Sequence, residues 1–300
     1  MVGKGQFGKG TKEISSLWKD KTLVIVQYPG YNVYNQSAKK IATKRWYNSD
    51  IKYINFSDIK NSKRKTEEIY LDVHGQMIAI TNSTMSSIDF KKDGWAYNYI
   101  QQDFKRDWEE WTKKFNKDVN NCFYKHRSNP YMIFLAKSLE KIENSSAERT
   151  ELLLDILFNT VDNFSKGDYE YWDPKKDNDF YNTKENKEVL KNKTLIIDEK
   201  CLPTDKKNPE LLEIDNLKSN YRGNIKIVSE EELKSIIASN DKNYAYLHVI
   251  MDGSFPTFSI IDISQRKIIY TGQERTKMGD TSFAKIFIRA LNGISNDVFE

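Results

Sequence analysis

The chain has 300 residues, of which 38% are hydrophobic, 13% aromatic and 30% charged. This composition predicts a folded protein rather than a disordered one, because each aromatic side chain buries a large apolar area. The formal net charge of +4 falls well short of the basic footprint of a dedicated nucleic-acid binder. No apolar run approaches the ~18 residues of a membrane-spanning helix, so we expect no transmembrane segment.

Residues 1–14 are a glycine- and lysine-rich lead-in that we expect to be flexible. Gly3, Gly8 and Lys9 match the spacing of a phosphate loop, but Gly10 stands where that loop needs the serine or threonine that binds magnesium. The lead-in also lacks the apolar stretch of a signal peptide. It therefore predicts neither a nucleotide site nor, for the chain as given, a secretion signal.

A first α/β half is predicted over residues 15–92. It begins with a buried strand at Lys21–Tyr28, where apolar and β-branched residues continue up to the turn at Pro29 and Gly30. A helix is expected over 35–47, since its apolar residues have helical spacing. Three further strands, the last two paired as a hairpin, are expected at 51–56, 69–73 and 77–81.

The middle of the chain, residues 93–165, is predicted as a helical segment. Its large apolar side chains recur at helical spacing, which is typical of one face of a helix. They are Trp95, Tyr99, Phe104, Trp108, Trp111, Phe115 and Val119. A second helix is expected over 131–142, and Ser145 with Glu148 forms a capping box that begins a third. Residues 166–191 are predicted as a linker or extended surface segment.

The second half, predicted over residues 192–300, repeats the order of the first. Three of its segments match strands of the first half, namely Lys193–Asp198, Ile225–Val228 and Tyr246–Val249. A capping box at Ser229–Glu232 begins one helix, and an amphipathic helix over 282–294 closes the chain. The sequence therefore predicts an α/β or α+β fold with two related β-α-β-α-β-β halves, an internal duplication with a helical segment between its copies.

The cysteines and histidines form no metal-binding pattern. Cys122 and Cys201 belong to no Cys-x-x-Cys motif, and we expect two separate thiols rather than a bridge. His74, His126 and His248 are scattered, without the spacing of a zinc site, and His248 is expected to be a packed strand residue. We predict no metal centre and no cofactor.

The sharpest catalytic candidates are Asp198 and Lys200, which follow the opening strand of the second half. An acid and a lysine at a strand end are how metal-dependent nucleases hold magnesium and orient water. Such a site needs another acid, which Asp72 or Asp262 could supply. The alternative interpretation is a charged strand end that enters a loop. The first half has Val26 where the second has Asp198.

The aromatic stripe around Trp108, Trp111 and Phe115 allows two interpretations. Interleaved lysines could contact phosphates while the rings stack on bases. Acidic residues share the same turns, however, and Glu109 with Lys113 has the spacing of a helical ion pair. An ordinary amphipathic helix, packed on a core or on a partner, is the favoured interpretation.

Three segments, Lys21–Pro29, Lys193–Ile197 and Ile225–Glu232, carry a resemblance to a family. They resemble uncharacterised Bacteroidetes proteins that have two α/β halves around a helical middle. The resemblance implies an exported or envelope-associated protein, and it assigns no functional residue.

The leading functional hypothesis is a non-enzymatic binding or structural protein, with a protein partner or self-association through Trp108, Trp111 and Phe115. The alternative is a metal-dependent hydrolase or nuclease that uses Asp198, Lys200 and, only in that case, magnesium. Nucleic-acid binding by the basic faces and the lead-in is a further alternative.

Overall fold

The computed structural model of the protein describes residues 21–47, 49–59, 68–74, 77–82, 131–133, 145–165, 181–202, 209–250, 257–273 and 282–300. The chain divides into two compact units, Met1–Asp173 and Pro174–Glu300, and each contains one sheet. None of the described helices combines the length and the apolarity needed to cross a membrane.

The first unit contains a five-stranded sheet with the order β2-β1-β3-β4-β5. β1 pairs in parallel with β2 and β3, whereas the β3–β4 and β4–β5 pairs are antiparallel. β1 lies inside the sheet, between β2 and β3, and Leu23 to Val26 are all buried, as expected for a continuous apolar run in a parallel strand. The strands are β1 (Thr22–Gln27), β2 (Ile51–Asn55), β3 (Glu68–His74), β4 (Met77–Asn82) and β5 (Tyr131–Ile133).

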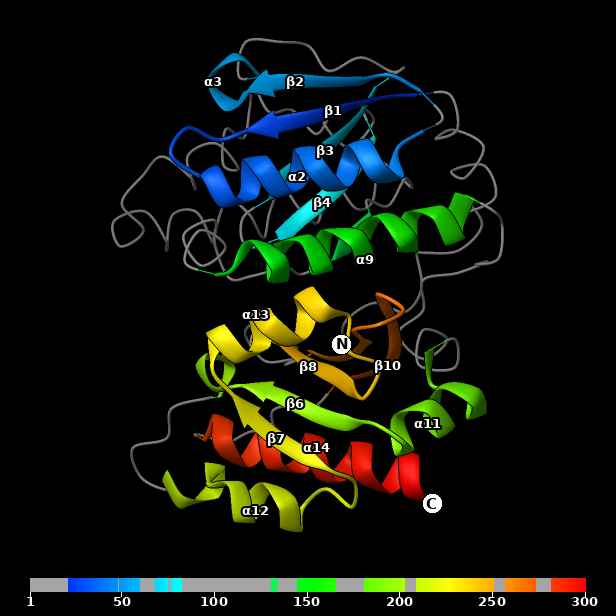
Figure 1. Ribbon diagram of the computed structural model, residues 1–300. Coiled ribbons are helices and arrows are strands. Elements are labelled where there is room, and N and C mark those ends of the chain that lie inside the picture. Colours follow the sequence, from blue (N-terminus) through cyan, green and yellow to red (C-terminus); the bar gives the residue numbers. More distant parts are fainter. Residues whose placement is uncertain are drawn as a thin grey trace, which may run out of the picture. The chain divides into compact units, whose positions relative to one another are not determined.

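Two long helices of the first unit, α2 (Asn32–Arg45) and α9 (Ala147–Ser165), lie side by side (Figure 1). The short helix α3 (Phe56–Ile59) follows β2 directly. α2 buries Tyr34, Ala38, Ile41 and Ala42, which recur at helical spacing. It begins three residues before the start expected from the sequence.

The second unit contains a sheet with the order β7-β6-β8-β9-β10. β6 pairs in parallel with β7 and β8, and the β8–β9 and β9–β10 pairs are antiparallel. This sheet therefore has the same strand order and directions as the first. The strands are β6 (Thr194–Asp198), β7 (Ile225–Val228), β8 (Tyr244–Ile250), β9 (Thr257–Asp262) and β10 (Lys267–Gln273).

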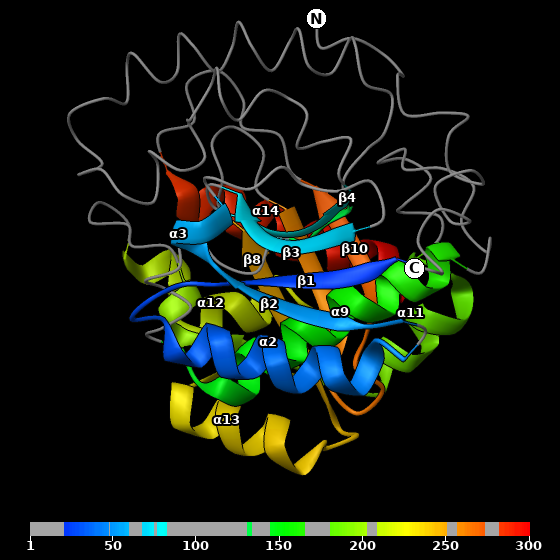
Figure 2. The same cartoon turned by 90° about the horizontal axis from the view of Figure 1, so that it is seen from above.

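Helices cover both faces of the second sheet. α14 and α12 lie on one side and α13 on the other (Figure 1), and the turned view again places β8 between α13 and α14 (Figure 2). On α14, Phe287, Leu291 and Ile294 pack into the core that contains Leu195 and Ile197 of β6. The helical elements are α11 (Lys184–Lys191), η1 (Glu199–Cys201), η2 (Pro209–Leu212), α12 (Ile214–Ser219), α13 (Glu230–Ser239) and α14 (Phe283–Phe299).

The two predicted capping boxes differ from the observed helix starts. At α13, the Ser229 hydroxyl accepts from the Glu232 backbone N–H at 3.2 Å, as expected. The Glu232 carboxylate does not complete the box but pairs with Lys226, and this hydrogen bond raises the pKa of Lys226. At α9 the cap is Ser146, which accepts from the Arg149 backbone N–H at 3.3 Å, rather than the predicted Ser145.

Two segments have a different structure from the predicted one. Residues 131–133, expected to begin a helix, form β5 and complete the first sheet, so that sheet extends past the boundary expected at residue 92. A short apolar run such as Tyr131–Ile133 fits a strand and a helix equally well by periodicity, and pairing with β4 decides between them. Residues 184–191, expected in a linker, form α11, which Thr183 caps.

The strands matched in the sequence occupy matching register positions. Leu23 pairs with Ile51 as Leu195 pairs with Ile225, and Val24 pairs with Tyr70 as Ile196 pairs with Tyr246. The predicted α/β class is confirmed. The origin of the two units in one duplicated ancestor remains a prediction that their shared topology supports.

Candidate functional sites

β6 ends at Asp198, the first of the two residues that the sequence proposes for catalysis. Its side chain is completely buried, and its Oδ1 accepts a hydrogen bond from the Lys200 backbone N–H at 2.9 Å. This bond caps the turn η1. Lys200 itself is exposed. The two candidates therefore differ in environment, since one is a buried carboxylate bound to backbone and the other faces solvent.

Asp198 lies where α/β sheets usually bind ligands. After β6 the chain continues to β7 on one side and later to β8 on the other, so the carboxyl ends of β6 and β8 flank a topological switch point. Continuing the pairing of Ile196 with Tyr246 places Asp198 beside His248, which itself pairs with Ser259. The β6–β8 pairing itself ends at Ile196 and Tyr246, so the paired row here consists of His248 and Ser259, an imidazole and a hydroxyl.

His248 is enclosed within this row. It is 5% exposed, and its ring centroid lies 5.9 Å from that of Tyr246. This burial agrees with the packed strand histidine expected from the sequence. An imidazole beside a carboxylate is suited to holding or moving a proton, and a neighbouring hydroxyl can act as a hydrogen-bonding group or a nucleophile.

Asp262, one of the two acids that could complete a magnesium site, does not lie at the strand end of Asp198. Asp262 lies 3.3 Å from the Lys193 ammonium, at the opposite end of β6, and it accepts from the Ser264 hydroxyl at 2.7 Å. Asp72 belongs to β3 of the first unit. Within the described ranges, no group of three or more His, Cys, Asp or Glu residues could hold a metal ion.

The first unit closes the equivalent strand end differently. Tyr28 occupies the register position of Lys200, and its backbone N–H donates to Asn35 Oδ1 at 3.0 Å. Asn35 Nδ2 returns a bond to the Tyr28 carbonyl oxygen at 2.8 Å. Gly30, at φ +84°, allows the turn between them. Asp198 therefore supplies an acceptor that Asn35 supplies in the first unit, which indicates a structural role.

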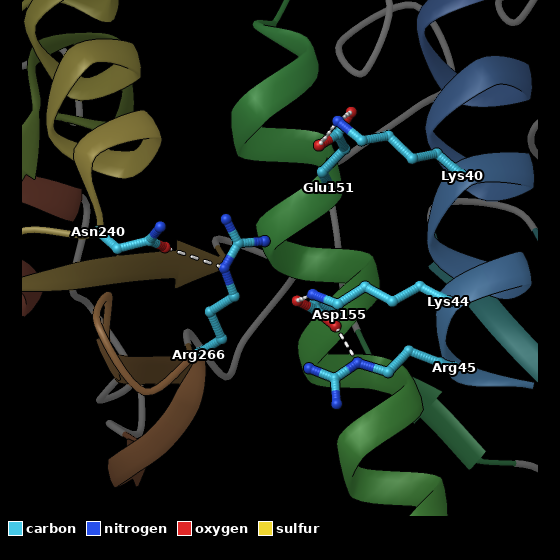
Figure 3. Close-up of polar contacts among 7 residues, drawn as sticks. All are labelled: Lys40, Lys44, Arg45, Glu151, Asp155, Asn240 and Arg266. Atoms are coloured by element: carbon cyan, nitrogen blue, oxygen red, sulfur yellow. Dashed lines mark hydrogen bonds and ion pairs between the residues drawn. The ribbon is translucent and has the colours of Figure 1, made fainter.

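A second polar cluster joins α2 and α9 (Figure 3). Lys40 pairs with Glu151 at 2.7 Å, and one turn later the completely buried Asp155 pairs with Arg45 and, at 3.5 Å, with Lys44. Because both rungs advance four residues on each helix, the two helices run parallel. This ladder stabilises the helix packing and leaves no reactive group exposed at Asp155.

The third feature is the edge of the first sheet. Within the described part of the chain, the exposed large hydrophobic side chains are Tyr47, at 69%, and Tyr53, at 40%. Tyr53 lies in β2 and Tyr47 shortly before it, and β2 is the last strand of its sheet. Lys39 of α2 lies over the Tyr53 ring, 5.7 Å from its centroid. Tyrosines with adjacent cations are frequent in protein interfaces.

The sequence did not single out this edge or Asn35. The sequence Ile51–Asn55 does contain a signal for an edge strand. Lys52 and Tyr53 are adjacent, and neighbouring side chains of a strand point to opposite faces, so each face of the sheet carries one of the two. Several features that the sequence predicts lie outside the described residues. They are the lead-in, Cys122 and the aromatic stripe with Trp108, Trp111 and Phe115.

Comparison of the chain with protein-family models, curated proteins and solved structures finds no match. The resemblance to Bacteroidetes proteins therefore stays a prediction.

Proposed function

We propose that the protein is a non-enzymatic interaction protein that binds a partner protein at the β2 edge of its first unit. The observation that carries this proposal is two exposed aromatic side chains, Tyr53 on the edge strand β2 and Tyr47 in the connection that leads into it. Tyrosine gives large contact area and a polar tip at low entropic cost, which is why it is enriched at binding hot spots.

The environment of Asp198 supports the non-enzymatic part of this proposal. Its carboxylate is buried and accepts from the Lys200 backbone, and Asp262 is engaged by Lys193. Both acids thus have structural partners that account for their presence. Asn35 performs the same task as Asp198 in the first unit without any acid.

The experiment uses a photo-crosslinking amino acid in place of Tyr47, in cells that express the protein naturally. We expect a discrete adduct with one partner. In Tyr53→Pro the adduct should disappear, because proline removes a backbone N–H from the open edge, whereas Tyr53→Phe should retain it. The same crosslinker in place of the exposed Lys242 of the second unit is the control. An adduct that survives Tyr53→Pro, or none at Tyr47, would contradict the proposal.

The switch-point position of Asp198 and His248 favours one alternative, the metal-dependent hydrolase or nuclease. There Asp198 would hold magnesium, which would activate water, and Lys200 would orient it. Asp198→Asn keeps an acceptor for the Lys200 N–H but removes the charge, so it should abolish cleavage without lowering the melting temperature. Wild-type protein that cleaves neither DNA nor RNA with magnesium would remove this alternative.

Self-association through Trp108, Trp111 and Phe115 is an additional proposal, which rests on the sequence pattern alone. Light scattering of Trp108→Ala/Trp111→Ala tests it, since the double variant should have a lower mass than the wild type. A wild-type monomer would refute it.

A further inference from the structure

We propose that the partner segment is an extended strand, acidic at its centre, that adds to the β2 edge. This inference rests on the proposed function and identifies the chemistry of the partner. Strand addition gives affinity through backbone hydrogen bonds and specificity through side chains. Both depend on which backbone and side-chain groups β2 directs outward.

The backbone of β2 has a defined open side. The Leu23 N–H donates to the Asp50 carbonyl oxygen at 2.9 Å, and in a parallel ladder alternate residues face the neighbouring strand. Lys52 and Ile54 therefore turn their backbone groups toward β1. The backbone groups of Ile51, Tyr53 and Asn55 point the other way, where no described strand lies. They form a template for an added strand.

Cations flank the centre of this template on both faces of the sheet. Lys39 covers the Tyr53 ring on the α2 face. On the opposite face Lys52 is 54% exposed and lies 3.4 Å from Glu68, a carboxylate that also accepts from the Tyr70 hydroxyl. Of the four basic residues of α2, Lys40, Lys44 and Arg45 pair with acids of α9, and Lys39 is outside that ladder. An acidic residue at the centre of the added strand would meet the Lys39 ammonium on the α2 face and, on the other face, the Lys52 ammonium, which it would share with Glu68.

A second copy of this chain fits the edge less well. Antiparallel pairing of two β2 strands about Tyr53 would bring the two copies of Lys39 together above the paired tyrosines. Pairing about Lys52 would set two ammonium groups directly opposite each other, which destabilises a strand pair. Charge therefore favours a different, acidic occupant over self-pairing.

The test uses three short labelled peptides of alternating valine and threonine. The first has two glutamates at its centre, the second has two lysines there, and the third is the glutamate peptide with N-methylated backbone amides. Fluorescence anisotropy with the full chain should show binding of the glutamate peptide, about tenfold tighter than the lysine peptide, a difference of about 1.4 kcal/mol. N-methylation should abolish binding, because it removes the donors of the added strand. Added salt should weaken binding, since these charges are exposed.

Charge reversal supplies the decisive control. Lys39→Glu should reduce or invert the preference for glutamate over lysine, and Lys285→Glu, at an exposed position on α14, should leave it unchanged. Equal binding of the two peptides, or binding of the N-methylated one, would overturn the acidic-strand inference. If the glutamate peptide fails while the Tyr47 adduct depends on Tyr53, the inference falls and the interaction function stands. If both fail, both are wrong.

Discussion

The two units share one strand order but close the same strand end with different chemistry. In the first unit Asn35, from helix α2, binds the backbone N–H and carbonyl of Tyr28. In the second, Asp198 binds the N–H of Lys200 from the last position of β6 itself. The topology needs an acceptor at this place, and either residue can supply it. A carboxylate at a strand end is therefore weak evidence for catalysis.

The units also differ in how the helix that follows the last strand is held. α9 is joined to α2 by the ladder of Lys40, Arg45 and Lys44 with Glu151 and Asp155. α14 packs through apolar side chains, its 2.7 Å ion pair of Lys187 with Asp297 is half-exposed, and its buried Ser295 accepts from the Arg222 backbone N–H at 2.9 Å. Apolar area contributes to helix packing in both units, since α9 buries Leu152, Leu154 and Leu157 completely, and buried charge adds to it in the first.

The largest loss of stability is expected when the first unit receives a carboxylate at the position that Asp198 occupies in the second. Val26 occupies the register position of Asp198 and is completely buried. Val26→Asp should cost about 3–5 kcal/mol, because the new carboxylate is buried and Tyr28 already has its acceptor. Urea unfolding measures this cost. Gln27→Asp, at a half-buried neighbouring position, is the control, and an equal loss there would refute the comparison.

The contribution of the ladder to stability is tested by removing the two cationic side chains that pair with Asp155. In Lys44→Ala/Arg45→Ala the buried carboxylate loses its ion pairs with these two cations, so we expect a loss of about 3 kcal/mol in the free energy of unfolding. Asp155→Leu should cost less, since an apolar residue of similar size removes the buried charge as well. Hydrogen exchange in α2 and α9 locates the effect. A larger loss in Asp155→Leu than in the double variant would contradict this account.

Much of the fold was predictable because buried parallel strands have long apolar runs. Lys21–Tyr28 and Lys193–Asp198 predicted the interior parallel strands β1 and β6, and the matched segments predicted the shared register. β5 was missed because its three residues carry too little periodicity, and only the pairing with β4 identifies them. α11 was missed because its polar sequence leaves only Leu190 buried.

The candidate sites were less predictable, since they depend on contacts between distant residues. Asp198 was correctly placed at a strand end, but its bond to Lys200 is a local backbone feature that composition does not reveal. Asp262 could be assigned to Lys193 only once β9 was known to pair with β8. The exposure of Tyr53 depends on β2 lying at the sheet edge, and strand order is a property of topology rather than of local pattern.

A smaller, matched effect should follow when each strand-end acceptor is removed. Asn35→Ala and Asp198→Ala each leave a backbone N–H without its acceptor, and each should cost about 1–2 kcal/mol. Asp198→Asn should be close to wild type. Similar losses in the two alanine variants would establish that the residues are structural equivalents. A stability unchanged in Asp198→Ala would instead favour a functional reason for the buried acid.

Substitution of the buried tyrosines Tyr221 and Tyr270 tests the dependence of stability on pH, and Tyr221 is expected to give the smallest change at neutral pH. In the first unit the Tyr70 hydroxyl donates to Glu68, whereas the Tyr221 hydroxyl of the second has no hydrogen-bond partner in the part of the chain that the structure describes. Burial raises the pKa of Tyr221, and burial together with Asp297 raises the pKa of Tyr270. Tyr221→Phe should therefore change neutral stability by less than about 0.5 kcal/mol, since no bond is lost.

Above about pH 10 the unfolded chain releases these phenolic protons while the folded chain keeps them. The unfolded state then binds fewer protons, so stability falls as the pH rises, by up to ~1.4 kcal/mol per pH unit for each tyrosine. Tyr221→Phe should remove one such contribution and flatten the alkaline decline in melting temperature. Tyr270→Phe should flatten it too, but at a cost at neutral pH, because its bond to Asp297 is lost. A decline unchanged in both variants would show that these hydroxyls ionise as readily in the folded protein as in the unfolded chain.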